Sequence, residues 1–303
     1  KKPFFLYLAL TSPHTPTSPS PPFAGRSQLG LYGDFIMETD AVVGRVLATL
    51  DRTGAAKNTL VIAASDHGPA LYAGRKRKAT YAQLKELEKD GHYSSGPYRG
   101  YKFSVYEGGF RIPCVARWPG VVAPGGSCDA LIGLQDLLAT SAEIAGTKLE
   151  TEEAPDSVSF LPLLKNPAAK GVRETLVVQG APAMAFHSGP WKLALCPGSG
   201  CAGRYGNSPP QEEAWKKALA DYGKKPANRK ELERAPFVQL FRLDNDPGET
   251  KNLAADQPEK VKELFKLINE QITAGRSTPG ANIPNDRDRI DLFRGIPRFV
   301  WRK

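Results

Sequence analysis

The sequence predicts an α/β fold, in which part of a large mixed, mostly parallel sheet flanked by helices is followed by a small antiparallel sheet with a packed helix. Two apolar runs, residues 4–10 and 59–64, with an amphipathic helical pattern between them, predict the first part. A change near residue 166, where short strand-like runs begin to alternate with loops, predicts the second. We therefore expect two units, residues 1–165 and residues 166–303.

Within the first unit, the opening apolar run is typical of a buried strand. Residues 31–52 place apolar side chains at helical spacing with acidic residues near the positive end, and Gly54 is a natural stop. We expect residues 59–64 to pair in parallel with the first strand, because strand, helix and strand then form a βαβ unit. A short helix near residues 81–89 and a longer one over residues 136–145 follow.

The second unit is predicted to hold a small antiparallel sheet. Its strands are expected at residues 174–179, 191–195 and 238–243. A final amphipathic helix is predicted over residues 257–274 and ends at Gly275. The helix would cover one face of the sheet with its apolar stripe.

The formal net charge of this 303-residue chain is +9, and much of it lies in two basic stretches, residues 75–89 and 216–234. Such a charge attracts nucleic acid, but it also attracts sulfated or phosphorylated substrates. The sequence has no RNP-type aromatic motif, no zinc-finger spacing and no helix-turn-helix signature, so nucleic-acid binding is not expected. The longest apolar runs are too short to cross a bilayer.

The chain has four cysteines, Cys114, Cys128, Cys196 and Cys201, and none of them forms a CxxC pair. This spacing argues against a structural zinc site. Cys196 and Cys201 bracket a glycine-rich segment. They could form a short-loop disulfide in an exported protein, or all four could be thiols.

Asp66 and His67 directly follow the second predicted strand. In open α/β sheets, ligands bind beyond the carboxyl ends of strands, and a carboxylate there needs a positive partner. Gly68 and Pro69 supply a sharp turn that lets both side chains face a metal ion. The alternative is an aspartate in a turn with a hydrogen-bonded histidine beside it.

His14 follows the first predicted strand, and prolines on both sides stiffen its loop. If both strands belong to one sheet, His14 and the Asp66-His67 pair lie at the same edge. An imidazole there can donate to an anionic oxygen or act as a general acid. The alternative is a loop histidine with a structural hydrogen bond.

Lys102 lies between Gly100 and Gly108, which let the backbone approach a ligand closely. A lysine at such a place can neutralise a sulfate or phosphate oxygen. Glu107 and Arg111, four residues apart, are expected to form an ion pair. A surface lysine is the alternative for Lys102.

Together these segments resemble the formylglycine-dependent (type I) sulfatases of the alkaline phosphatase superfamily. Two further segments resemble the C-terminal subdomain of that family. The six segments appear in the family's order and are residues 13–16, 59–68, 98–113, 117–120, 191–193 and 243–253.

The resemblance implies a role for each matching residue. Asp66 would ligate a divalent cation, usually calcium in this family, and His67 would ligate the metal or contact the sulfate. Lys102 and His14 would hold sulfate oxygens, and one of them would protonate the leaving alcohol. The loops at residues 71–96 and 197–236 are expected to shape the rim of the pocket, with His92 and Tyr93 as candidates for contact with the substrate.

The family's nucleophile is a formylglycine made from Cys or Ser in a Cys/Ser-x-Pro-x-Arg motif. We expect that motif, two metal-binding aspartates and a further Lys/His pair upstream of Lys1, so the isolated chain is expected to be inactive. The expected substrate is a sulfated small molecule or a sulfated glycan, and the family's habit suggests a periplasmic or secreted protein. The alternatives are a phosphate- or phosphonate-ester hydrolase and a non-catalytic module that binds sulfated glycans.

Overall fold

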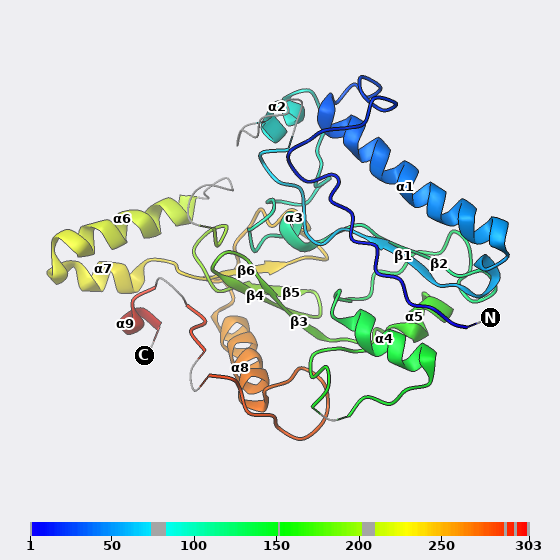
Figure 1. The fold of residues 1–303 in the computed structure, drawn as a ribbon. Coiled ribbons are helices and arrows are strands. Elements are labelled where there is room, and N and C mark those ends of the chain that lie inside the picture. Colours follow the sequence, from blue (N-terminus) through cyan, green and yellow to red (C-terminus); the bar gives the residue numbers. More distant parts are fainter. Residues whose placement is uncertain are drawn as a thin grey trace.

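The fold is taken from a computed structural model of the chain (Figure 1). The residues that the structure describes are 2–73, 83–150, 152–201, 210–287, 290–293 and 296–301.

The long helix α1 (Leu31–Thr53) confirms the predicted amphipathic helix. Gly54 ends it with a left-handed φ of 71°, a conformation that glycine adopts without a steric cost. Asp34 in the first turn is buried and accepts hydrogen bonds from the backbone N–H groups of Gly25 and Ser27, at 2.8 and 2.6 Å. This carboxylate therefore anchors the preceding loop to the start of the helix.

A single-turn helix, η1 (Ala56–Asn58), leads from α1 into β1 (Val61–Ala64), which pairs antiparallel with β2 (Cys114–Arg117). The α/β class is confirmed, but the expectation that residues 4–10 form a buried strand parallel to β1 is wrong. In the described part of the chain residues 4–10 form no strand, and Phe5 and Tyr7 are each 82% exposed. An apolar run signals a need for burial, but a strand also needs a neighbouring backbone with which to pair.

Four shorter helices follow in the described part of the first unit. The helix expected near residues 81–89 is confirmed from residue 83 onward, while residues 81 and 82, like part of the basic stretch at 75–89, lie outside the described residues. The expected helix at residues 136–145 is confirmed and ends at Gly146. The four are α2 (Gln83–Lys89), α3 (Glu107–Phe110), α4 (Asp136–Ala145) and α5 (Leu161–Lys165).

The second unit contains the predicted antiparallel sheet, with its strands in chain order. It has one strand more than the sequence patterns indicated, because β4 interrupts its apolar residues with His187 and was not recognised. The four strands are β3 (Thr175–Gln179), β4 (Met184–Ser188), β5 (Trp191–Ala194) and β6 (Gln239–Arg242).

The predicted final helix is confirmed as α8 (Pro258–Ala274), which packs on this sheet (Figure 1). Leu264 and Ile268 from the helix join Phe186 and Leu193 from the strands in one buried apolar cluster. The basic insertion and the tail add further helical segments on the same side. These are α6 (Pro210–Lys224), η2 (Pro226–Asn228), α7 (Arg229–Arg234) and α9 (Arg298–Trp301).

A buried ion pair joins the helical edge of the first unit to the start of the second. Arg173 donates to both carboxylate oxygens of Asp136, the first residue of α4, and also to the carbonyl of Asp156 at 2.6 Å. The same carboxylate accepts the backbone N–H groups of Gly133 and Val158. The boundary at residues 165/166 stays a prediction.

No helix in the described ranges is long and apolar enough to cross a membrane. All four cysteines are thiols, with Cys114 and Cys128 exposed and Cys196 and Cys201 buried. The disulfide alternative for Cys196 and Cys201 is therefore not realised in this structure.

Candidate functional site

His14 and Lys102, which are 88 residues apart in the sequence, meet in space. The Nδ1 atom of His14 lies 2.7 Å from the carbonyl oxygen of Thr15. Because a carbonyl can only accept a hydrogen bond, Nδ1 carries the proton and Nε2 presents a lone pair. Nε2 lies 3.4 Å from Lys102 Nζ and 3.4 Å from Tyr72 Oη, both of which can donate to it.

The turn that carries Lys102 is held by backbone contacts. The N–H of Lys102 donates to the carbonyl of Pro69 at 2.8 Å, directly after the Asp66-His67 turn. Phe103 has a φ of 77°, a left-handed conformation that is costly for a residue with a side chain. The Lys102 ammonium lies 5.2 Å from the centre of the Phe103 ring and 5.9 Å from that of Tyr72. These ring faces attract the cation and help to fix its position.

Asp66 and His67 follow β1, as predicted, and their side chains face one another. Asp66 Oδ2 lies 3.3 Å from His67 Nε2, and the Asp66 side chain is 81% exposed. His67 Nδ1 lies 2.8 Å from the carbonyl of Gly68 and therefore donates to it. With the proton on Nδ1, two acceptors face each other across 3.3 Å. A cation or a second proton between them relieves that repulsion, so the pair fits part of a metal shell.

The pair supplies only two ligands, whereas calcium takes six to eight oxygens. Among the described residues no group of three or more histidine, cysteine, aspartate or glutamate side chains is arranged to hold a metal ion. Any further ligands for a cation at Asp66 would come from water, from substrate, from backbone or other side-chain oxygens, or from further protein segments.

Glycines pack the two halves of the site against each other. The N–H of Gly68 donates to the carbonyl of Gly109 at 2.9 Å. A Cβ atom on Gly68 would lie 1.8 Å from the carbonyl oxygen of Gly108, which is far inside contact distance. Only glycine at position 68 lets the metal-side turn lie this close to α3, the helix that follows the Lys102 turn.

Gly68→Ala is expected to lower the free energy of unfolding by about 1–3 kcal/mol, because the new methyl group must push two backbone segments apart. The matched control is Gly44→Ala within α1, where an added Cβ meets nothing within 4 Å. Alanine there is expected to stabilise the helix by up to about 1 kcal/mol. Urea unfolding of the two variants measures both effects, and equal stabilities would contradict the tight packing.

Residues 1–147 match a family model described as Sulfatase. This part of the chain belongs to the sulfatase family. Its matched range contains His14, Asp66, His67, His92 and Lys102, the five residues that the sequence patterns selected.

Relatives of the sulfatase family extend this likeness over most of the chain. An N-acetylgalactosamine-6-O-sulfatase of Bacteroides thetaiotaomicron is 35% identical over 269 residues, which cover 88% of this chain and 47% of that protein. A steryl-sulfatase of Rattus norvegicus is 41% identical over 165 residues, covering 54% of this chain and 26% of that protein. The chain thus spans about half or less of the length of the curated relatives it matches.

A solved structure agrees with these sequence matches. It comes from work on the metabolism of multiple glycosaminoglycans by Bacteroides thetaiotaomicron and superposes with a TM-score of 0.71 at 32% sequence identity. The match covers 89% of this chain and 50% of that one. Both units of the present fold therefore have a counterpart in a solved structure.

One stretch of this chain, residues 95–99, fits the letters Ser-x-Pro-x-Arg of the sulfatase nucleophile motif. The letters of the motif therefore do not occur only upstream of Lys1, contrary to the expectation from the sequence. In this chain they follow Asp66-His67. The Ser95 hydroxyl donates to the carbonyl of Gly100 at 3.2 Å, while Arg99 donates to the carbonyl of Glu249 at 3.0 Å. Serine and arginine thus serve different local partners, and we assign the stretch no nucleophile role.

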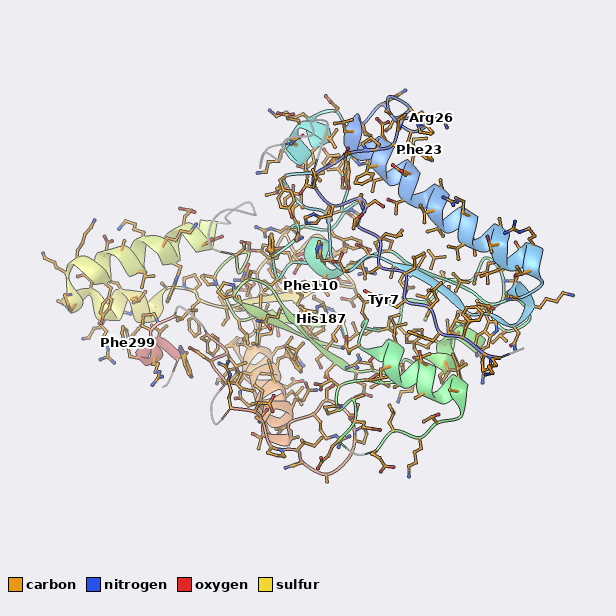
Figure 2. The ribbon with its side chains drawn as sticks, in the orientation of Figure 1. Tyr7, Phe23, Arg26, Phe110, His187 and Phe299 are labelled. Carbon is orange, nitrogen blue, oxygen red and sulfur yellow. The ribbon has the colours of Figure 1, made fainter. Side chains whose placement is uncertain are left out.

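The sequence patterns missed a buried group of charges behind the site. Lys192 Nζ lies 2.8 Å from Glu107 Oε1 and 2.8 Å from Glu249 Oε1, and all three side chains are at most 6% exposed. Glu249 also accepts the backbone N–H of Glu107 at 2.6 Å. His187, which Figure 2 shows among the strands of the sheet, lies 3.5 Å from Glu107. The predicted pair of Glu107 with Arg111 is present at a looser 3.8 Å.

Burial and charge shift the pKa values in this group. Burial, supported by the charge of Lys192, lowers the pKa of His187 to about 4. Burial alone would raise the pKa of Glu107, but Lys192 and His187 bring it below its ordinary value. For Glu249 burial outweighs the attraction of Lys192, so its pKa is raised. The histidine is therefore neutral near neutral pH, and the single lysine faces two carboxyl groups.

His187 is expected to contribute a fall of roughly 3 kcal/mol in the free energy of unfolding as the pH drops from about 6.5 to about 4, because the unfolded state binds a proton there more readily than the folded state. Glu107, with a lowered pKa, acts in the same direction, and Glu249, with a raised pKa, opposes it. Urea unfolding at several pH values measures the slope. His187→Gln should flatten it and His92→Gln should not, and equal slopes in all three proteins would contradict this assignment.

His92, predicted to contact substrate, lies half-buried just after α2, with its backbone N–H donating to the carbonyl of Leu87 at 3.0 Å. The next residue, Tyr93, lines a pocket beside the Lys102 turn. The substrate role of His92 stays a prediction.

Proposed function

We propose that the whole protein hydrolyses sulfate esters and that this chain supplies part of its anion-binding and metal-binding site. The observation that carries the proposal is the meeting of Lys102 Nζ with His14 Nε2 at 3.4 Å, on a turn whose backbone is bonded to Pro69, next to Asp66 and His67. Relatives named as sulfatases support the reaction class. Nothing in the chain favours a phosphate or phosphonate ester over a sulfate ester, or a purely non-catalytic role.

In this proposal each side chain has a distinct task. The Lys102 ammonium donates hydrogen bonds to sulfate oxygens and stabilises the charge that gathers on them in the transition state. His14 accepts from Lys102 through Nε2, and the two together provide the proton for the leaving alcohol. Asp66 and His67 would hold the divalent cation of this family, expected to be calcium, which would polarise the sulfate group. The formylglycine nucleophile is proposed to come from an upstream segment.

We further propose that the substrate is a sulfated glycan rather than a small sulfated molecule. The support is that the relatives matching 88% of this chain are named N-acetylgalactosamine-6-sulfatases. The excess of positive charge is consistent with a polyanionic substrate. From the family's habit we also propose a periplasmic or secreted location.

Lys102→Ala in the full-length protein is expected to lower kcat/KM for an aryl sulfate by about 10²–10³-fold, because one charged donor to the transition state is lost. The control is Lys57→Ala, an exposed lysine on η1 that should leave kcat/KM unchanged. Initial-rate assays with an aryl sulfate and with N-acetylgalactosamine 6-sulfate measure both. The isolated chain should show no turnover, and calcium-dependent turnover by residues 1–303 that disappears in Lys102→Ala would refute the expected division of the site.

A further inference from the structure

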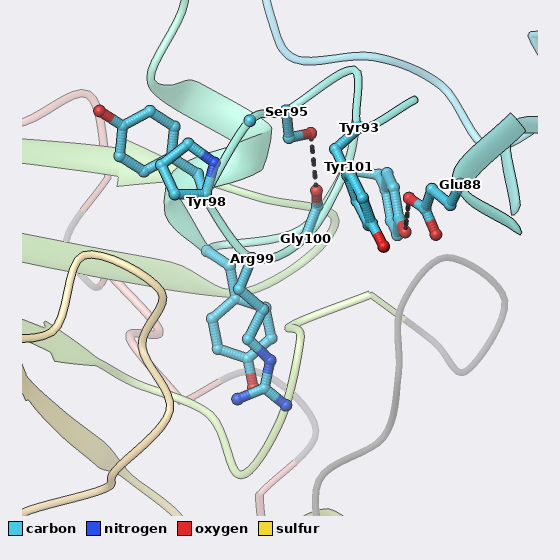
Figure 3. Close-up of a pocket in the computed structure, with 10 residues that line it drawn as sticks. Glu88, Tyr93, Ser95, Tyr98, Arg99, Gly100 and Tyr101 are labelled. Atoms are coloured by element: carbon cyan, nitrogen blue, oxygen red, sulfur yellow. Dashed lines mark hydrogen bonds between the residues drawn. The ribbon is translucent and has the colours of Figure 1, made fainter. Parts of the chain in front are cut away.

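A pocket of about 330 Å³ lies beside the Lys102 turn, a volume within the range of small-ligand sites. Figure 3 shows it between the rings of Tyr93 and Tyr101 on one side and the Arg99 side chain on the other, with Tyr98 above. On the side of Tyr93 and Tyr101, the hydroxyl of Tyr101 donates a hydrogen bond to the carboxylate of Glu88. The pocket thus combines aromatic rings with a few polar groups, and Tyr93 is the most exposed of these rings. One face of the Tyr106 ring is covered by Arg99, and one face of the Tyr98 ring is covered by Arg111.

Charge balance narrows the class of ligand. The Arg99 guanidinium stacks 4.3 Å from the ring centre of Tyr106 and donates to the carbonyl of Glu249. Glu88 brings a carboxylate to the same pocket, so the lining carries one formal positive and one formal negative charge. For an anionic ligand the repulsion by Glu88 offsets the attraction by Arg99, whereas a neutral ligand with hydroxyl groups meets both donors and acceptors without that opposition.

The shape of the pocket and the exposure of its rings narrow the class of ligand further. A pyranose ring has an apolar C–H face that packs on an aromatic ring, and its hydroxyl groups bind the polar groups at the edge. Tyr93 is 62% exposed, so a large apolar ring surface is available at the mouth of the pocket. Ser95 adds a hydroxyl, which donates to the carbonyl of Gly100 and can still accept.

The pocket and the sulfate site share one loop. Tyr101 forms part of the pocket wall, and the next residue is Lys102. The loop is fixed at both ends, because the carbonyl of Arg99 accepts from Gly108 at 2.7 Å and the N–H of Lys102 donates to Pro69 at 2.8 Å. Lys102 is therefore one residue away from the pocket wall, on a loop whose backbone is held in place.

We propose that the pocket of Tyr93, Tyr98, Tyr101, Arg99 and Glu88 binds a neutral pyranose unit of the glycan next to the sulfated one. This inference rests on the proposed glycan sulfatase function, yet it can be tested without catalysis. The suitable probe is a tetrasaccharide of N-acetylgalactosamine and other neutral pyranose units, made with and without a single 6-sulfate group on an N-acetylgalactosamine.

Titration of a low concentration of residues 1–303 with the unsulfated tetrasaccharide, followed by the NMR signals of the ligand, is expected to show binding that weakens about tenfold in Tyr93→Ala and in Tyr98→Ala. Tyr7→Ala, an 82% exposed tyrosine outside the pocket, is the control and should bind like the parent. The sulfated tetrasaccharide should bind more tightly, and Lys102→Ala should remove that gain without changing the binding of the unsulfated one.

The outcomes separate the two proposals. If the parent protein bound the sulfated and unsulfated tetrasaccharides equally well, the proposed sulfate site would be contradicted, but the pyranose pocket would not. No binding of the unsulfated tetrasaccharide to the parent would overturn the pocket, as would equal binding by the parent, Tyr93→Ala and Tyr98→Ala. Because Tyr93 is exposed, Tyr93→Ala should keep the parent's circular dichroism spectrum and unfolding midpoint, so a change in affinity reports on the pocket.

Discussion

Lys192→Met is expected to lower the free energy of unfolding by about 3–5 kcal/mol. Methionine keeps much of the side-chain length but removes the cation that faces Glu107 and Glu249, each 2.8 Å away. Both carboxyl groups are buried, so neither can recover the lost interaction from water. Because Glu107 begins α3, which packs on Gly68, the change should also loosen the turn of Asp66 and His67.

Urea unfolding at neutral pH measures this effect, with two comparison variants. Glu249→Gln is expected to cost less than Lys192→Met, since burial already raises the pKa of Glu249 and the amide keeps the shape of the carboxyl group. Lys57→Met on the exposed surface should change stability by less than about 0.5 kcal/mol. If Lys192→Met were as mild as Lys57→Met, the group of buried charges would have no part in holding the two units together.

Arg173→Met is expected to be comparably severe, at about 3–5 kcal/mol, because it leaves the buried carboxylate of Asp136 without its cation. It also removes donors from the carbonyls of Asp156 and Thr175. The matched control is Arg117→Met, which breaks an exposed pair with Asp51 at 3.0 Å and should cost about 0–1 kcal/mol. Thermal unfolding of both variants measures the contrast, and similar midpoints would show that burial adds nothing to the Arg173 pair.

Local patterns predicted α1, α2, α4 and α8, but they gave no prediction for the 15-residue helix α6. Residues 31–52, 136–145 and 257–274 showed helical spacing with a glycine just past the end, and each forms a helix that ends at that glycine. Hydrogen bonds within a helix connect residues four apart, so its evidence is contained in a short window of sequence. The same reasoning found the run that becomes β1 but misassigned its partner, because strand pairing joins segments that are distant in the sequence.

The sequence predicted part of the site and missed the buried charges behind it. His14 and Lys102 were selected by their place in a family pattern, and the structure brings them together. Lys192 and Glu249 lie in two of the family segments, but their pairing was not predicted, since they lie 85 and 142 residues from Glu107 and meet it only after folding. A lysine in the middle of a short strand was the one available hint, because buried lysines are rare unless paired.

The exposed apolar segment at residues 4–10 has a consequence for handling this chain. Phe4, Phe5, Leu6, Tyr7 and Leu8 are each at least half exposed, on both sides of an extended backbone whose hydrogen-bonding groups are open to pairing. Such a segment favours association between copies of the chain. When purified alone, the chain should therefore form oligomers as its concentration rises, and it should increase the fluorescence of dyes that bind hydrophobic surfaces. The double variant Phe5→Lys, Tyr7→Lys should stay monomeric.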